Sequence, residues 1–322
     1  MLPDDPRVQA GLFGVALPGL IGLVCMLPAV LVARRGKRQA GDAASSGTRA
    51  HSRAGYGPAL GLGLAYVAAS VGLLGMPDNW PRSTTEWLAP LILLGTLLIA
   101  LPDLVGPIGT RRLAVWLGRA GFAAAVLVWP IANTRANRWE GSELWLWHAG
   151  IGLWLLLAFA CMDRVSAKLS PVFTAVVVGL TVVGLIPVVF GAGVTSHPQV
   201  SGGMGAAIGA VGVVTILTRG IVPLRGAASL LVVWLTMTLL VSYQFIANMA
   251  WWEFGVVASL PLVLATLTIL PKIGKLNSNK LGWIAVVITV GLTAAVSGQH
   301  VPGLIAELTG SGGSSIDDYY GY

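Results

Sequence analysis

The sequence predicts an all-α fold, a polytopic bundle of about ten transmembrane helices. Of its 322 residues, 55% are hydrophobic and only 10% are charged, whereas about 25% of the residues of a soluble domain are charged. Apolar runs of about 20 residues recur along the chain, and a helix of that length crosses the roughly 30 Å hydrocarbon core of a bilayer. These observations exclude an ordinary soluble enzyme and indicate a single integral membrane domain over residues 1–322.

Charged or turn-forming residues bound the ten expected spans. In the first half, residues 10–33 end before Arg34, 57–76 before Pro77, 87–106 before Pro107, 113–133 before the loop with Arg135, and 144–163 before Arg164. In the second half, residues 171–192 begin at Pro171, 203–222 end before Pro223, 226–248 follow Arg225, 251–270 end before Pro271, and 281–299 follow Lys280. Successive loops between spans lie on alternate sides of the membrane. Both termini are therefore expected on one side, and the following loops on the other: 34–56, 107–112, 164–170, 223–225 and 271–280.

The charges orient this bundle independently of the span count. The membrane side that contains loop 34–56 carries 16 of the 20 Lys and Arg residues and 3 of the 13 acidic residues. The side that contains the termini carries the rest. Lys and Arg are retained on the cytoplasmic side during insertion. We therefore expect both termini on the exoplasmic side of a plasma membrane. The retention of Lys and Arg during membrane insertion also accounts for the net positive charge of the chain, so no nucleic-acid partner is expected.

Two segments outside the spans have the composition of flexible connectors. The cytoplasmic loop 34–56 is rich in Gly, Ala and Ser, and the exoplasmic tail 300–322 contains a Gly-Ser run followed by acidic and tyrosine residues. The tail is able to dock on an exoplasmic protein, although disorder is the stronger expectation for a terminus. Cys25 and Cys161 lie in apolar spans, which is typical of buried thiols rather than of a disulfide or a metal site.

The spans 87–192 and 203–299 show a weak internal similarity. Each contains an Ile-Ala-Asn triplet, at residues 131–133 and 246–248, followed by Trp139-Glu140 in the first and Trp252-Glu253 in the second. This order predicts two parallel copies of a four-helix unit, an arrangement that many membrane carriers show. Chance similarity between apolar sequences is the competing explanation.

Small and polar residues inside the spans predict contacts between helices. Gly57-x3-Gly61 and Gly205-x3-Gly209 have the spacing that lets two helices approach closely. Gln244 and Asn248 share one helix face at i and i+4, and they either line a pathway or, the favoured interpretation, bond to a neighbouring helix.

Charged residues within the spans lie close to the cytoplasmic edge. There are four of them, Asp103, Arg119, Asp163 and Arg219. All lie within about two helical turns of the cytoplasmic edge, where they can snorkel or pair with loop charges. No carboxylate is expected near the centre of a span, which disfavours an ion-coupled carrier of the buried-acid type.

Aromatic and acidic residues gather at the exoplasmic edge. Eight of the 12 Trp residues lie there and two at the cytoplasmic edge, whereas an interfacial aromatic belt populates both edges about equally. The excess predicts a surface that binds a ligand or a partner by stacking, cation–π contact or hydrogen bonding. Its candidate residues are Trp139, Glu140, Glu143, Trp147, His148, Trp251, Trp252 and Glu253.

His148 has two alternative roles. Ala149 and Gly150 beside it leave room for a flat macrocycle, so its imidazole is able to ligate the metal of a haem or chlorophyll. A hydrogen-bonded interfacial histidine is the favoured alternative. A tetrapyrrole is thus the one cofactor that the sequence suggests, although the sequence requires no cofactor. No other metal site is expected.

Three classes of function remain after these observations. A small-solute permease with an exoplasmic aromatic and acidic vestibule is slightly favoured, because kinked Gly-rich helices suit a pathway. A non-catalytic subunit or scaffold of a larger membrane complex, or a homo-oligomer, is nearly as well supported. A haem- or chlorophyll-binding protein is third. No nucleotide-binding fingerprint is present and catalytic residues are not expected, although Ser201 and Ser297 lie at the depth of His300.

Overall fold

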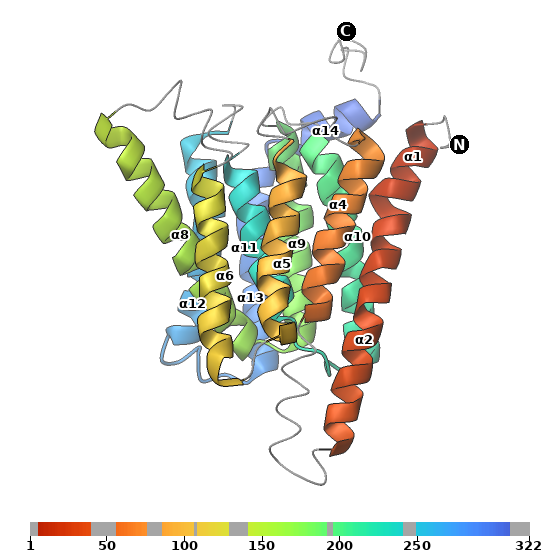
Figure 1. The fold of residues 1–322 in the computed structure, drawn as a ribbon. Coiled ribbons are helices and arrows are strands. Elements are labelled where there is room, and N and C mark those ends of the chain that lie inside the picture. Colours follow the sequence, from red (N-terminus) through yellow and green to blue (C-terminus); the bar gives the residue numbers. More distant parts are fainter. Residues whose placement is uncertain are drawn as a thin grey trace.

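The computed structural model describes residues 6–39, 56–75, 86–105, 108–128, 141–191, 196–240 and 249–309. Every regular element in these ranges is a helix, which confirms the predicted all-α class (Figure 1). In chain order the elements are α1 (Pro6–Gly11), the π-helix η1 (Leu12–Ala16), α2 (Leu17–Gln39), α4 (Tyr56–Leu74), α5 (Leu88–Val105), α6 (Ile108–Val128), α8 (Gly141–Lys168), α9 (Pro171–Gly191), α10 (Ser196–Leu217), α11 (Arg225–Leu239), α12 (Trp251–Ile269), α13 (Ser278–Ser297) and α14 (Val301–Leu308).

The described helices form a multi-pass bundle of the kind that crosses a membrane. Seven of them are long and apolar enough to span a bilayer, and α5, α6 and α11 contain shorter apolar segments. Each predicted span overlaps one of these helices, with α1, η1 and α2 forming a single continuous helix. The count of ten spans, the sidedness of the termini and the internal duplication stay predictions.

The segment predicted as a flexible tail differs from that expectation at its start. Residues 301–308 form α14, which packs against α9 because apolar side chains such as Leu304 recur at helical spacing. The part of the tail after residue 309 lies outside the described residues. In the predicted loop 34–56, α2 continues to Gln39, and residues 40–55 are outside the described part.

Helix α11 forms the centre of the bundle. It packs against α4, α5, α8, α9 and α12, and every residue from Gly226 to Leu239 is buried. Trp234 is fully buried there, and its indole N–H donates to Ser201 Oγ of α10 over 3.1 Å. The described part of the bundle is therefore solidly packed around α11.

One of the two predicted glycine motifs lets α4 approach α2 closely. A Cβ atom added at Gly57 would lie 2.7 Å from the carbonyl oxygen of Cys25, and one at Gly61 would lie 3.4 Å from Gly22 Cα. Both glycines thus permit backbone contact between the helices. In the second motif, Gly205 faces Val183 of α9, whereas Gly209 faces open space.

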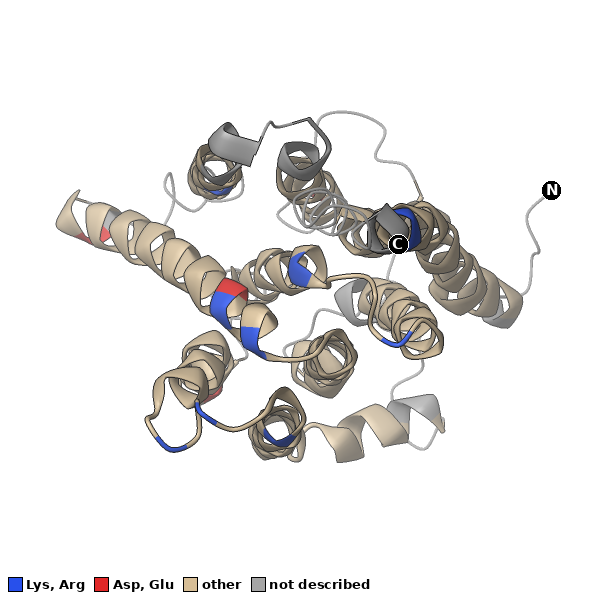
Figure 2. Ribbon diagram, turned by 90° about the horizontal axis from the view of Figure 1, so that it is seen from below, with Lys and Arg blue, Asp and Glu red and all other residues tan. Residues whose placement is uncertain are grey.

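Basic residues mark one end of the bundle, which we call the inner end. Lys168 ends α8, Arg225 begins α11 and Lys280 lies in the first turn of α13. Figure 2 views the bundle from below and colours the Lys and Arg residues blue. Helices α1 and α14 lie at the opposite, outer end (Figure 1). This distribution is the one expected when Lys and Arg stay in the cytoplasm.

Cysteine labelling tests this orientation. We expect Ser142→Cys, exposed at the start of α8, to react with an impermeant maleimide in intact cells. Ser278→Cys, exposed at the start of α13, should react only after permeabilisation. Both changes are made after Cys25 and Cys161 are replaced by Ala. Equal labelling of both positions in intact cells would contradict the assigned sidedness.

Candidate functional site

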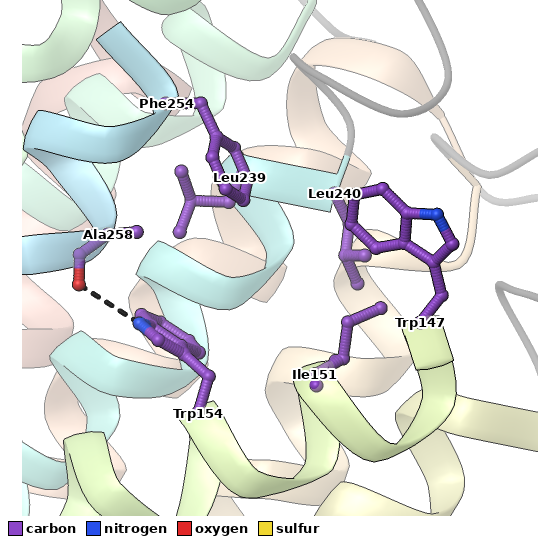
Figure 3. Close-up of a pocket in the computed structure, with 8 residues that line it drawn as sticks. Trp147, Ile151, Trp154, Leu239, Leu240, Phe254 and Ala258 are labelled. Atoms are coloured by element: carbon purple, nitrogen blue, oxygen red, sulfur yellow. Dashed lines mark hydrogen bonds between the residues drawn. The ribbon is translucent and has the colours of Figure 1, made fainter. Parts of the chain in front are cut away.

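A cavity of about 260 Å³ lies between α8, α11 and α12 in the outer half of the bundle. Three helices line it with apolar and aromatic side chains and one glycine: Trp147, Gly150, Ile151, Trp154, Leu239, Leu240, Phe254 and Ala258. Figure 3 shows the side chains from the three helices converging on this space. The cavity is partly open, and no residue of its lining carries a charge. We call it the outer pocket.

Trp154 fixes the inner boundary of the outer pocket. Its indole N–H donates to the carbonyl oxygen of Ala258 over 3.0 Å, which ties α8 to α12 (Figure 3). A buried indole needs such a partner, and forming this bond leaves only the apolar ring surface facing the cavity. The pocket is therefore suited to an apolar group rather than to a sugar or an anion.

Helix α8 supplies one face of the pocket through residues at helical spacing. Trp147, Ile151 and Trp154 follow one another at i, i+4 and i+7, so they share a helix face. Glu143 is four residues before Trp147 on this face and is exposed. At 1.5 Å per residue, Trp147 and Trp154 lie about 10 and 20 Å along the helix from Gly141. An acidic side chain thus lies on the outer side of an apolar cavity.

The two halves of α8 differ in their packing. Its outer half leans away from the neighbouring helices (Figure 1) and leaves Trp145 74% and Leu153 61% exposed. Its inner half is held by Arg164, whose Nε donates to Thr268 Oγ1 of α12 over 3.0 Å. The outer pocket occupies the space between the outer half of α8 and the ends of α11 and α12.

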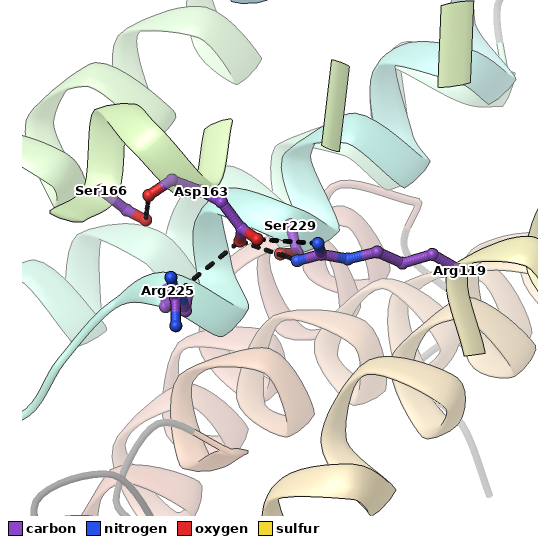
Figure 4. Close-up of polar contacts among 5 residues, drawn as sticks. All are labelled: Arg119, Asp163, Ser166, Arg225 and Ser229. Carbon is purple, nitrogen blue, oxygen red and sulfur yellow. Dashed lines mark hydrogen bonds and ion pairs between the residues drawn. The ribbon is translucent and has the colours of Figure 1, made fainter. Parts of the chain in front are cut away.

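A buried ion pair also holds the inner half of α8. Both terminal nitrogens of Arg119 on α6 donate to the Asp163 carboxylate of α8 over 2.7 Å, and Nη2 also donates to Ser229 Oγ of α11 over 3.2 Å (Figure 4). Arg119 is 3% exposed, and its guanidinium lies over the rings of Trp116 and Phe159. Of the two expected alternatives, snorkelling and pairing with a loop charge, Arg119 adopts neither in that form, because it pairs with Asp163 of α8 inside the bundle.

A second polar cluster lies at the outer end, where α12 begins. Glu253, 1% exposed, accepts the backbone N–H of Ala250 at 2.8 Å through Oε2. Its Oε1 lies 2.7 Å from His300 Nε2 and also accepts from the side-chain amide of Gln299. Glu253 thus caps α12 and joins it to the turn between α13 and α14.

The predicted exoplasmic site residues occupy different surroundings in the structure. Trp147 lines the outer pocket, Glu143 lies on its outer side, and Glu253 is buried one residue before Phe254. Trp251 and Trp252, on α12, are exposed and do not line the pocket. Four further predicted residues lie outside the described residues: Trp139, Glu140, Gln244 and Asn248.

His148 and the serines enter separate contacts. His148 is half-buried on α8 and is not part of the pocket lining, so the structure does not place its imidazole in this cavity. Its role as a tetrapyrrole ligand stays a prediction. Ser201 accepts from Trp234, Ser297 donates to the Gly184 carbonyl, and His300 contacts Glu253, so none of these contacts joins a serine to His300.

Sequence reasoning missed most of the pocket lining. Trp154 could have been predicted to share a helix face with Trp147, because it follows Trp147 by seven residues. Phe254 and Ala258 could have been assigned to one face of α12, because they are four residues apart. The opposition of α8 to the ends of α11 and α12 had no signal in the sequence, because helical periodicity identifies a face and not the partner of that face.

No known protein family matches this chain, and neither a curated protein nor a solved structure matches it. Its function is therefore inferred from its own residues.

Proposed function

We propose that this protein is a small-solute permease whose substrates are amphipathic cations, with the outer pocket as the binding site. The observation that supports this proposal most directly is the outer pocket itself, a partly open apolar cavity between three helices. The functions of its parts follow from their chemistry.

The lining of the outer pocket selects the apolar part of the solute. A cavity of about 260 Å³ is just below the roughly 300–1,000 Å³ typical of small-molecule sites. It accommodates one ring or a short alkyl chain, and the rings of Trp147 and Phe254 provide flat surfaces for contact.

The surroundings of the pocket select the charge of the solute. Glu143 is on the same face of α8 as Trp147, one turn nearer the outer end. A cation whose apolar part occupies the pocket would contact the Trp147 ring by cation–π attraction and the Glu143 carboxylate by Coulomb attraction. An anionic solute of the same shape gains neither interaction.

The packing of α8 supplies a means of transport. Its inner half is fixed by Asp163 and Arg164, whereas its outer half leans away from the neighbouring helices. Closing the outer half over a bound solute and releasing the inner contacts would expose the pocket to the two sides in turn, as alternating access requires. In this proposal the structure represents a state with its inner contacts closed.

Filling the pocket tests the binding site. Gly150 lines the pocket and a Cβ atom added there meets no atom within 4 Å, so Gly150→Leu adds apolar volume at the cavity. We expect this variant to bind radiolabelled octyltrimethylammonium at least about tenfold more weakly in nanodiscs and to lose its uptake into proteoliposomes. Octanoate, which has a similar chain and a negative charge, should bind weakly to both proteins.

Gly291→Leu provides the matched control. Gly291 is also inside a helix, α13, is exposed, and has no atom within 4 Å of an added Cβ. This variant should bind and transport octyltrimethylammonium like the wild type. Unchanged binding in Gly150→Leu, or equal losses in both variants, would refute the outer pocket as the solute site.

A non-catalytic subunit of a membrane complex is the second candidate. The solid packing around α11 favours it, since every residue from Gly226 to Leu239 is buried and this helix offers no polar pathway. The exposed apolar outer half of α8 would then contact another subunit. Stoichiometric companions on purification from native membranes, together with no solute binding, would favour this candidate over the permease.

A further inference from the structure

Four exposed cationic side chains lie at the inner end of the bundle, where α12 turns into α13. We call them the inner basic surface, and they are Arg164, Lys272, Lys275 and Lys280. The sequence contains no Asp or Glu between Glu253 and Glu307. Asp163, beside Arg164, is already bound by Arg119 through two hydrogen bonds of 2.7 Å. Within the described part of the chain, none of the four cations forms an ion pair with a carboxylate.

Contacts between helices hold the parts of this surface together. Arg164 of α8 reaches the last turn of α12, where its Nε donates to Thr268 Oγ1 over 3.0 Å. The turn after α12 folds back on the same residue, so that a Cβ atom added at Gly274 would lie 2.5 Å from the Thr268 carbonyl oxygen. Lys275 follows Gly274 directly. Insertion requires only that cations stay on one side of the membrane, whereas here Arg164 and Lys275 are brought to one residue by packing.

An exposed aromatic and apolar face adjoins this surface on α13. Trp283 and Val287 follow Lys280 at i+3 and i+7, so the three share a helix face, and the last two are 64% and 66% exposed. Phe173 of α9 contacts the Trp283 ring edge-to-face, with ring centroids 5.5 Å apart. At 1.5 Å per residue, Trp283 lies about 5 Å and Val287 about 10 Å along the helix from Lys280. The headgroup layer on each side of a bilayer is roughly 5–8 Å thick. When Lys280 lies among the headgroups, Trp283 is therefore at the hydrocarbon boundary and Val287 is in the hydrocarbon.

The chemistry of an anionic phospholipid matches these three levels. Its phosphate oxygens accept hydrogen bonds from ammonium and guanidinium groups. Its ester oxygens, at the hydrocarbon boundary, accept from an indole N–H, and its acyl chains cover apolar side chains. A soluble anion gains only the first of these interactions. A zwitterionic phospholipid brings a positive group that the inner basic surface repels.

We propose that the inner basic surface and the adjoining face of α13 bind one anionic phospholipid from the leaflet at the inner end. Basic sites between membrane helices bind such headgroups in other proteins. The proposal is independent of the permease function, because it uses neither the outer pocket nor any residue of its lining. A phosphate held by Arg164, Lys275 and Lys280 would join α8, the turn after α12, and α13.

Lipid binding to the purified full-length protein tests the proposal. Native mass spectrometry in detergent measures the affinity for the first bound lipid, with dioleoyl phosphatidylglycerol and dioleoyl phosphatidylcholine as probes. The wild type should bind phosphatidylglycerol at least about tenfold more tightly. Lys280→Gln should weaken its binding about fivefold, the contribution of one cation near an anionic surface. The double variant of Lys275→Gln and Lys280→Gln should lose the preference. Both side chains are exposed, and size-exclusion profiles check that the variants fold.

The matched control is the double variant of Arg34→Gln and Arg35→Gln. These two cations are also exposed, and they lie toward the inner end of α2, a helix that packs against α4 and α10. The control removes the same charge from the same end of the bundle and should keep the preference for phosphatidylglycerol. Equal losses in the two double variants would show that a diffuse positive field attracts the lipid, and would overturn the site.

The acyl chains and the headgroup are tested separately. Trp283→Leu should weaken phosphatidylglycerol binding several-fold, since it removes the indole at the hydrocarbon boundary. Glycerophosphoglycerol, which is the headgroup without chains, and inorganic phosphate should not displace the lipid at millimolar concentration. Displacement by either would identify a site for soluble anions and overturn the lipid assignment. A wild type without preference, or a preference kept after both lysines are replaced, would overturn the proposal as a whole.

Discussion

Asp163→Ala is expected to lower the free energy of unfolding by about 3–5 kcal/mol, because it leaves the guanidinium of Arg119 buried without its counter-ion. Arg119 is 3% exposed and gives two hydrogen bonds of 2.7 Å to this carboxylate. Ser229 remains as a partner, but it carries no charge. Reversible unfolding in mixed detergent micelles, followed by circular dichroism, measures the loss.

Two further variants separate the buried charge from other causes. Arg225 also approaches Asp163, at 3.5 Å, but its side chain is 63% exposed, so Arg225→Ala should cost less than about 1 kcal/mol. Replacing Arg119 and Asp163 together by Leu removes both charges and should destabilise less than Asp163→Ala alone. A stability of Asp163→Ala equal to that of the wild type would contradict the buried ion pair.

The ion pair between Arg119 and Asp163 also affects the position of α8 at the outer pocket. Asp163 ties α8 to α6, and Arg119 extends the contact to Ser229 of α11. The pair fixes the inner half of α8 and so determines where its outer half leaves the bundle. In the proposed transport cycle these contacts open when the solute leaves on the inner side, so Asp163→Ala should also alter the rate of solute release.

Hydropathy identified the helices because each span is long, apolar and bounded by polar residues. It did not identify α11 as the central helix, since lipid chains are as apolar as a protein interior and a span facing either one has the same composition. Only the pairing of helices distinguishes α11 from a helix such as α13, whose Val287 is 66% exposed. That pairing depends on contacts distant in sequence.

The polar clusters were difficult to predict for a related reason. Arg119 and Asp163 were both placed near the inner edge, but their pairing joins residues that are 44 apart. Glu253 was placed at the exoplasmic edge because it lies at the start of the predicted span 251–270. It is buried because it caps the first turn of α12, a role that the residue at the cap position, Ala250, does not signal. Its partner His300 lies 47 residues away.

Trp234→Ala is expected to lower the free energy of unfolding by about 3–5 kcal/mol, the range measured when a large buried aromatic side chain is removed. Trp234 has no exposed surface and lies on α11, which packs against α4, α5, α8, α9 and α12. The cavity left by the indole would be bounded by rigid helices and would collapse only in part. The same unfolding measurement applies, and the loss should be accompanied by weaker solute binding, since Leu239 on the same helix lines the outer pocket.

The position of Trp234, rather than its residue type, determines this effect. Trp145 is 74% exposed on α8, so Trp145→Ala should change stability by less than about 0.5 kcal/mol. Ser201→Ala keeps the packing of Trp234 but removes the acceptor of its N–H, and should cost about 1–3 kcal/mol. If Trp234→Ala and Trp145→Ala had equal effects, α11 would not be the packed centre of the bundle.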